Sequence, residues 1–151
     1  IVISNFVGII RNQLKDSLCR VFPDNVQYKC MFEGEEKTVI PDASINCQIK
    51  AKRGNYFINA PRFVMEVLSD STEKYDRTEK KCIYQDQDID EYWIADWRKR
   101  EIEIYTLDYE NALPVYHLFK KITRSNKDEL EMIHFPNIKV TFDDLFDGIE
   151  K

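Results

Sequence analysis

Apolar residues recur at three- and four-residue intervals near the start of the chain, with charged side chains between them. They are Ile3, Phe6, Val7, Ile10, Leu14 and Leu18. Such spacing is typical of a helix that buries one stripe against a core. It predicts a helix that ends before the pair Phe22 and Pro23, because proline does not continue a helix.

The next apolar segments have the length and spacing of strands. Extended segments are predicted over residues 26–32 and 37–47, joined by a turn at 33–35. Pro41 cannot donate a hydrogen bond to a sheet ladder, so it indicates a strand edge, a bulge or a strand end. The run 63–68 is apolar on both faces, which is typical of a central strand covered on both sides.

The rest of the chain alternates between helix and strand patterns. Asp76, followed by Glu79, is typical of a helix start with Asp76 as the cap. The remaining predicted elements are a loop at 49–59, a helix to residue 87, a hairpin from 91–97 and 100–107, a strand at 115–122, an extended end at 138–142 and a helical turn at 143–146. This order predicts an α/β (α+β) domain around a mixed central β-sheet flanked by helices.

Composition narrows the class of protein. The 151 residues, 43% of them hydrophobic, are enough for one domain over 1–151, which we expect to lack a short N-terminal segment because no initiator Met is present. No apolar run reaches the roughly 18 residues of a membrane span, and no signal peptide is visible, so we expect a cytoplasmic protein. Four scattered cysteines predict reduced thiols. The sequence contains no glycine-rich phosphate loop, so we expect no organic cofactor.

Two acids stand out within this pattern. Glu66 lies inside an apolar strand, where an ionised carboxylate needs a compensating partner: an exposed strand end, a buried cation of the chain, or a metal ion. Asp42 follows Pro41, which on its own is ordinary turn chemistry. If neighbouring strands bring the two acids together, their oxygens offer part of the octahedral shell of Mg²⁺.

One face of the predicted second helix carries polar and ionisable side chains that could take part in chemistry. Asp76, Lys80, Tyr84 and Gln87 are spaced to point the same way. A solvated helix with an ion pair between Asp76 and Lys80 would have the same spacing. The net charge of −5 confines any nucleic-acid contact to a local surface.

Several of these pieces together resemble a known family. The matching pieces, in order, are residues 39–42, 61–72, 76–80 with Tyr84, 90–96, 135–138 and 144–146. They are similar to the bacterial Uma family of restriction-type endonucleases, within the PD-(D/E)xK nuclease superfamily. The resemblance covers essentially the whole chain and implies a restriction-endonuclease-like core and a Mg²⁺-dependent DNA endonuclease.

The resemblance also implies roles for single residues. Asp42 corresponds to the acid of the PD motif and Glu66 to the acid of the (D/E)xK motif. Leu68 stands where the superfamily has its lysine, and Lys80 corresponds to the lysine that serves instead on the helix. The expected metal ligands are Asp42, Glu66 and the backbone carbonyl of Val67, with Mn²⁺ able to replace Mg²⁺. The residues with expected supporting roles are Asp76, Arg77 and Tyr84.

Candidate DNA contacts come from basic residues around these acids, and they are Lys50, Lys52, Arg53, Arg62 and Lys74. Such residues would position the phosphate backbone without reading a sequence. Cleavage of both strands needs two active sites, so we expect a homodimer. Two other readings stay open. The domain could be a catalytically inactive nuclease-fold module that binds nucleic acid or protein, or it could be a metal-dependent hydrolase of another phosphate ester.

Overall fold

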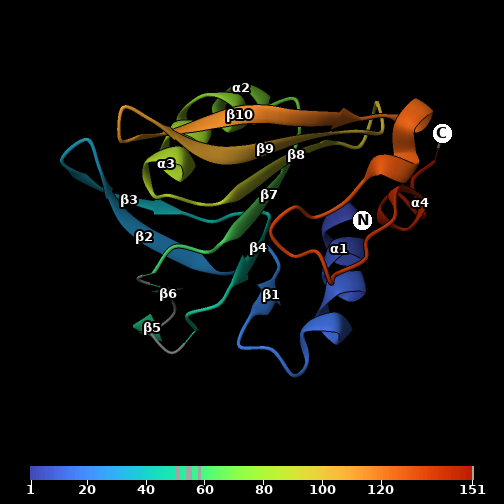
Figure 1. Cartoon of the computed structure of the whole chain (residues 1–151), viewed down its shortest axis with the longest axis horizontal. Helices are drawn as coiled ribbons and strands as arrows, with labels where there is room; N and C mark the ends of the chain where they lie inside the picture. The colour runs from blue at the N-terminus through green and yellow to red at the C-terminus, as the bar shows by residue number, and fades with distance from the viewer. Residues whose placement is uncertain (50–51, 54–55, 58, 151) are drawn as a thin grey trace.

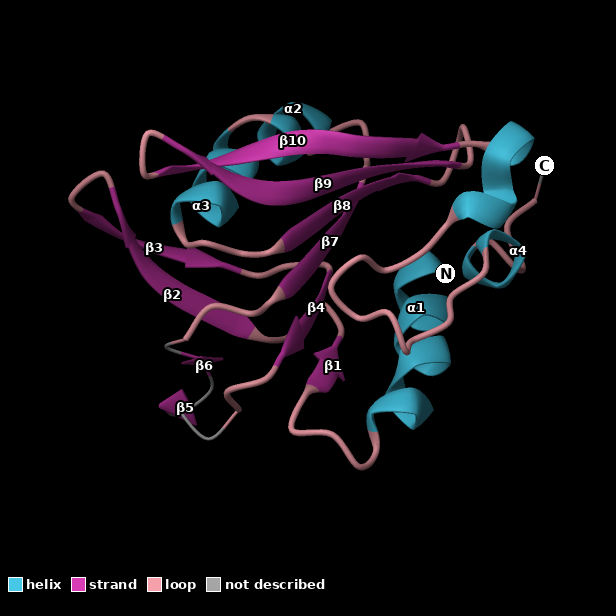
Figure 2. Ribbon diagram, in the orientation of Figure 1, coloured by secondary structure: helices cyan, strands magenta, loops and turns pink. Residues whose placement is uncertain are grey.

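A six-stranded sheet is the centre of the computed structural model, which describes residues 1–49, 52–53, 56–57 and 59–150 (Figures 1 and 2). In spatial order its strands are β1 (Arg20–Phe22), β4 (Ala43–Asn46), β7 (Phe63–Val67), β8 (Glu91–Asp96), β9 (Glu101–Glu110) and β10 (Leu113–Ile122). Only β7 and β8 are parallel within this sheet. The predicted mixed central sheet flanked by helices is therefore confirmed.

A second, smaller sheet stands beside the first. Its strands, in spatial order, are β3 (Glu35–Val39), β2 (Gln27–Phe32), β6 (Tyr56–Phe57) and β5 (Lys52–Arg53). The extended segment predicted at 37–47 is split between the two sheets, because the chain leaves β3 and reaches β4 through Pro41. Part of the loop predicted at 49–59 is strand instead, while residues 50–51, 54–55 and 58 of that prediction lie outside the described residues.

One face of the large sheet is covered by both ends of the described chain. The helix α1 (Val2–Arg11) continues as a 3-10 turn at Asn12–Leu14 and so ends earlier than predicted. Phe6 of α1 stacks on Phe63 of β7 at 5.3 Å between ring centroids and is fully buried. The side chain of Asn5 donates to the backbone of the C-terminal segment, which joins the two ends.

The C-terminal segment is helical where it is regular. The helix η2 (Arg124–Glu129) and the short helix α4 (Phe142–Leu145) are its elements, so the helical turn predicted at 143–146 is present. No strand forms at the described residues 138–142, where an extended end is predicted: Thr141 is extended, with φ −106° and ψ 149°, but Phe142 already begins α4. Thr141 instead caps α4 by accepting from the Asp144 amide.

The opposite face of the sheet carries two short helices, α2 (Glu73–Arg77) and α3 (Glu79–Asp86). Thr78 separates them with a non-helical conformation, φ −119° and ψ −83°. The predicted single helix capped by Asp76 is therefore wrong: α2 begins earlier, and Asp76 lies inside it and is buried. The hydroxyl of Tyr92 in β8 donates to the Asp76 carbonyl at 2.8 Å and fixes α2 to the sheet.

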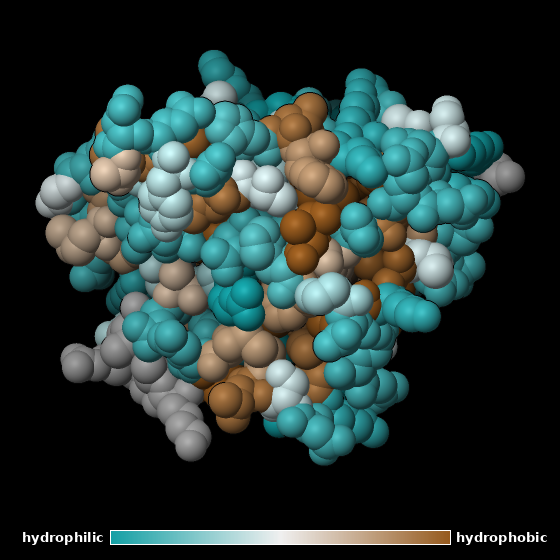
Figure 3. Space-filling view, in the orientation of Figure 1, coloured by the Kyte–Doolittle hydropathy of each residue, from teal (hydrophilic) through white to brown (hydrophobic). Residues whose placement is uncertain are grey.

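The surface is mixed rather than uniformly charged. On the face of Figure 3, apolar side chains gather in a band between the large sheet and α1, and hydrophilic side chains surround it. Among the described residues, no helix has the length and apolarity to cross a membrane.

Two cysteines form a disulfide, so the prediction of reduced thiols is wrong for them. Cys19 and Cys47 are bonded, with their Cα atoms 3.9 Å apart. The antiparallel register explains the pairing, because Arg20 lies opposite Asn46 and the two cysteines occupy the next position of the same ladder. The bond ties the edge strand β1 to β4, the strand that leads from Asp42.

This disulfide is expected to stabilise the fold substantially. Closing a loop with a sequence separation of 28 restricts the unfolded chain, which corresponds to roughly 3–4 kcal/mol. The double variant Cys19→Ser/Cys47→Ser should lose about that free energy of unfolding in urea titrations under non-reducing conditions. Cys82→Ser, which alters an exposed free thiol, is the control. Equal stability of both variants would show that the bond does not form in solution.

Candidate functional site

Asp42 directly precedes β4, and Glu66 lies in the neighbouring strand β7 at the centre of the large sheet. Ala43 of β4 is opposite Met65 of β7, and one further step of this register sets Asp42 beside Glu66. Side chains opposite one another in an antiparallel pair leave the sheet on the same face. The Val67 amide donates to Asp42 Oδ2 at 2.7 Å, which holds the aspartate at this position.

The Glu66 carboxylate is buried and receives donors on one oxygen. Its residue is 1% exposed, between Val64 and Leu68 on the same face of β7. The Tyr84 hydroxyl donates to Oε1 at 2.6 Å, and Lys80 Nζ lies 3.1 Å from the same atom. Within the described part of the chain, Oε2 has no hydrogen bond. One oxygen is thus available for a ligand that the protein itself does not provide.

Lys80 reaches Glu66 from the first turn of α3. Its ammonium is 3.8 Å from Asp76 Oδ1 as well, and its side chain is only 14% exposed. Burial acts to lower the pKa of Lys80, but the charges of Glu66, Asp76 and Asp42 outweigh it and raise the pKa. Lys80 therefore remains an ammonium ion in the neutral pH range and points into the acidic site.

Asp76 is the third acid at this place. The residue is 1% exposed, and its Oδ2 atom has no hydrogen-bond partner among the described residues. Burial is the main cause that raises the pKa of Asp76, and the negative charge of Asp42 adds to it. The predicted helix face is therefore correct in geometry for Asp76, Lys80 and Tyr84. Gln87 lies farther along the helix and bonds to Tyr28 and Met31 of β2.

The electrostatics of the site favour an additional positive charge. The pKa of Glu66 is raised to about 8: burial is the largest cause, Lys80 acts to lower the pKa, and the neighbouring Asp42 acts to raise it. One ammonium thus faces three carboxyl groups, Asp42, Glu66 and Asp76. Neutralisation requires a bound proton or a further cation.

The donor set fits a hard divalent cation held by few protein ligands. No group of three or more His, Cys, Asp or Glu side chains in the described ranges is arranged to hold a metal by itself. Mg²⁺ commonly takes one or two carboxylates and completes its shell with water and substrate phosphate. Asp42 and Glu66 supply such a pair, and the free Glu66 Oε2 is consistent with it. The predicted use of the Val67 carbonyl stays a prediction.

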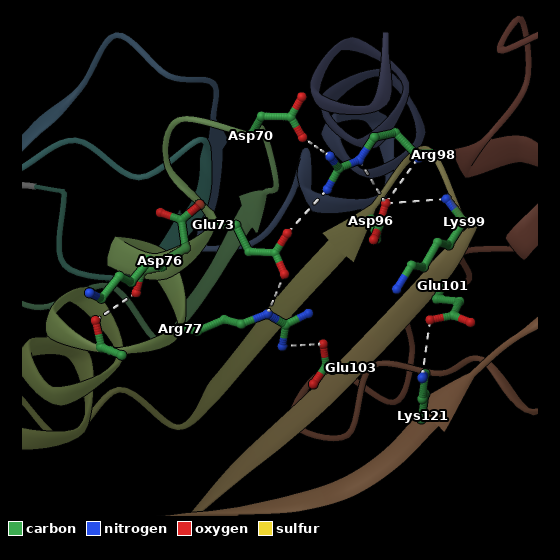
Figure 4. A network of polar contacts seen from close by, with 12 residues as sticks. Asp70, Glu73, Asp76, Arg77, Asp96, Arg98, Lys99, Glu101, Glu103 and Lys121 are labelled. Carbon is green, nitrogen blue, oxygen red and sulfur yellow. Dashed lines mark hydrogen bonds and ion pairs between the residues drawn. The ribbon is translucent and has the colours of Figure 1, made fainter.

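Arg77 is engaged outside the acidic site. It forms ion pairs with Glu73 at 3.0 Å and with Glu103 of β9 at 2.6 Å. Arg98, in the turn between β8 and β9, joins Asp70 and Glu73 to the same network (Figure 4). These contacts hold α2 against the sheet. The supporting role of Arg77 stays a prediction, and it would consist of fixing the position of α2.

The candidate DNA contacts are dispersed. Arg62 pairs with Asp90 at 3.1 Å at the start of β7, about 13 Å along the strand from Glu66 at 3.3 Å per residue. Lys74 is exposed on α2, the helix that carries Asp76. The other three candidates lie outside the described residues or have side chains that do: Lys50, Lys52 and Arg53.

The sequence pattern does not reveal that Asp76 is buried in the site. Asp76 is predicted as a helix cap with a supporting role, whereas the structure buries its carboxyl beside Lys80. The available signal was the spacing of Asp76, Lys80 and Tyr84 by four residues, which places three polar side chains on the face that meets the sheet.

Known proteins resemble the chain in sequence and in fold. The Uma2 family model, described as "Putative restriction endonuclease", matches residues 2–129. An uncharacterised protein of Synechocystis sp. is 30% identical over 95 residues, which are 62% of this chain and 49% of that protein. The chain thus spans about half the length of this curated relative.

A solved structure has the same fold. It is the crystal structure of a "putative nuclease belonging to DUF820" from Anabaena variabilis. The TM-score is 0.69 at 19% sequence identity, and the match covers 96% of this chain and 78% of the other. The predicted fold class and the resemblance to Uma-type proteins are confirmed by these findings.

The buried Glu66 makes the stability of the protein depend on pH. Its pKa is raised in the fold, so the folded protein retains a proton that the unfolded chain releases near the ordinary value of 4.5. The contribution of Glu66 is fully present below that value and is lost as the pH rises toward about 8. In metal-free urea titrations, wild type should lose a few kcal/mol relative to Glu66→Gln between about pH 5 and pH 8. Parallel pH profiles would contradict a raised pKa.

Proposed function

Because the chain belongs to the Uma2 family of "Putative restriction endonuclease" proteins, we propose that it is a Mg²⁺-dependent endonuclease that hydrolyses the phosphodiester bonds of DNA. The observation that carries the proposal is the meeting of Asp42, Glu66 and Lys80. The first two come from neighbouring strands, and Lys80 reaches Glu66 from α3 at 3.1 Å. Two acids and a lysine at one place are the residue types that metal-assisted phosphodiester hydrolysis needs.

Asp42 and Glu66 would hold the cation, with the Val67 carbonyl as a third ligand and Mn²⁺ as an alternative metal. When bound, the cation supplies a Lewis acid for the phosphate and lowers the pKa of a water molecule. The Val67 amide orients Asp42 through Oδ2, which would leave Oδ1 for the cation. Tyr84 donates to Glu66 Oε1, which would leave Oε2 for the cation.

Lys80 supplies the fixed positive charge of the chain itself. Its ammonium would orient the attacking water or neutralise charge that develops on the phosphate oxygens in the transition state. The pKa of Tyr84 is raised well above its usual range by burial, so Tyr84 remains a hydrogen-bond donor. The protein thus holds the Lys80 charge and the Tyr84 hydrogen-bond donor in place before the substrate binds.

Partners and location complete the proposal. A homodimer would bring two sites to the two strands of a duplex. Lys74 on α2 would contact phosphate near the site, and Arg62 would do so farther along the duplex. The sequence contains no dedicated base-reading motif, so cleavage should have no fixed recognition sequence. We place the protein in the cytoplasm, where its DNA substrate lies.

One observation favours a second candidate function. The ion pair between Lys80 and Glu66 compensates the buried acid in part without any metal, which suits a catalytically inactive nuclease-fold module that binds nucleic acid or protein. Activity assays separate the two candidates directly.

Plasmid nicking with Mg²⁺ or Mn²⁺ tests the enzyme. Asp42→Asn, Glu66→Gln and Lys80→Met should each reduce the nicking rate by about 100-fold or more, because the first two weaken the hold on the cation and the third removes a positive charge that faces the phosphate. Lys81→Met is the matched control: the neighbouring ammonium lies over the Tyr105 ring at 3.9 Å, away from Glu66, and its loss should leave the rate nearly unchanged.

Absence of nicking by wild type with either metal would overturn the enzymatic proposal in favour of the binding module. Hydrolysis of small phosphodiesters that excess duplex does not inhibit would instead indicate another phosphate ester as substrate. Equal loss in Lys80→Met and Lys81→Met would remove Lys80 from the site.

A further inference from the structure

The burial of the Asp76 carboxyl costs the folded protein free energy. Its carboxyl is buried to 1% exposure, and Oδ2 is the one side-chain polar atom among the described residues that is fully buried without a hydrogen bond. Unsatisfied buried polar atoms are rare because they lose their hydration without compensation. A residue with a purely structural task would be expected to satisfy both oxygens.

The segment around Asp76 is fixed by two contacts with the large sheet. Tyr92 of β8 donates to the Asp76 carbonyl at 2.8 Å. The side chain of the next residue, Arg77, pairs with Glu103 of β9 at 2.6 Å. The short helix α2 therefore cannot turn Asp76 toward solvent without breaking these contacts, and the carboxyl is held facing Lys80.

Lys80 lies near two acids, Glu66 of β7, which is a proposed metal ligand, and Asp76 of α2, which is not. Its ammonium is 3.1 Å from Glu66 Oε1 and 3.8 Å from Asp76 Oδ1. A divalent cation at Glu66 would repel the ammonium and weaken its attraction to that carboxylate. A long, flexible lysine whose other contact is the Tyr75 ring at 5.7 Å would then turn outward to water. Asp76, four residues before it, is the acid outside the proposed metal ligands that remains to retain it.

We infer that Asp76 is the positioning residue of Lys80: it keeps the ammonium in the active site once Glu66 is engaged by a cation. The inference rests on the proposed nuclease function and goes beyond it by giving Asp76, whose Oδ2 atom has no hydrogen bond, a defined task. On this account Lys80 shortens its contact with Asp76 when the cation binds, and the free Oδ2 atom accepts the ammonium. Asp76 acts through Lys80 and touches neither the cation nor the phosphate.

A double-mutant cycle tests this role. Asp76→Asn keeps the shape of the side chain and removes its charge. It should lower kcat for nicking by about 10-fold or more, with KM and the Kd for Mn²⁺ within about twofold of wild type. In a Lys80→Met background the same change should have no further effect, because the residue through which it acts is gone. Glu79→Gln, an exposed neighbour that pairs with Lys37 at 3.8 Å, should match wild type.

Unfolding temperature separates positioning from a structural role. Asp76→Asn should unfold at the same temperature as wild type or higher, since it removes a buried charge that lacks a full partner. Wild-type activity in Asp76→Asn, an additive loss in the Lys80→Met background, or a clear fall in unfolding temperature would each overturn the inference. A tenfold weaker Kd for Mn²⁺, measured by calorimetry, would make Asp76 a metal ligand instead. If wild type itself does not nick DNA, the proposed function fails and the inference with it, whereas an active wild type with an unaffected Asp76→Asn variant refutes the inference alone.

Discussion

The buried carboxylate of Glu66 is the constraint on which the site depends. An acid in the middle of a doubly covered strand is tolerated only where nearby groups offset its lost hydration. Tyr84 and Lys80 do so in part, and both reach the same oxygen. The remaining imbalance raises the pKa of Glu66, and it leaves a site that gains from a cation.

The fold places these groups by simple means. The register between β4 and β7 brings Asp42 beside Glu66, and the Val67 amide fixes it there. The short helices α2 and α3 lie over the same face of the sheet (Figure 1), and Lys80 of α3 reaches Glu66 there. The (D/E)xK position beyond Glu66 is occupied by Leu68, which is 1% exposed and packs in the core. A lysine supplied from the helix is therefore consistent with the packing of the strand.

Much of this arrangement can be predicted from the sequence, because it follows from local patterns. The apolar run around Glu66 and the four-residue spacing from Asp76 to Tyr84 predict the strand and the helix face. Interactions between segments that lie far apart in the sequence are harder to predict. The break at Thr78 has no proline or glycine to mark it, and the burial of Asp76 follows from a contact with Tyr92 of another element.

The disulfide was missed for the same reason. Cys19 and Cys47 are scattered in sequence and become neighbours only through the register of β1 and β4, which no local pattern specifies. The splitting of 37–47 into strands of two sheets also depends on pairing partners that lie elsewhere in the chain. The chemistry of single positions was thus easier to predict than the pairing that brings them together.

The most direct test of the account is anomalous diffraction from a crystal of the protein soaked in Mn²⁺. If Asp42 and Glu66 share a cation, one strong peak will lie in contact with a carboxylate oxygen of Asp42 and with Glu66 Oε2. Saturating Mn²⁺ that leaves no peak between these two residues, with Glu66 still held only by Lys80 and Tyr84, would contradict a shared cation.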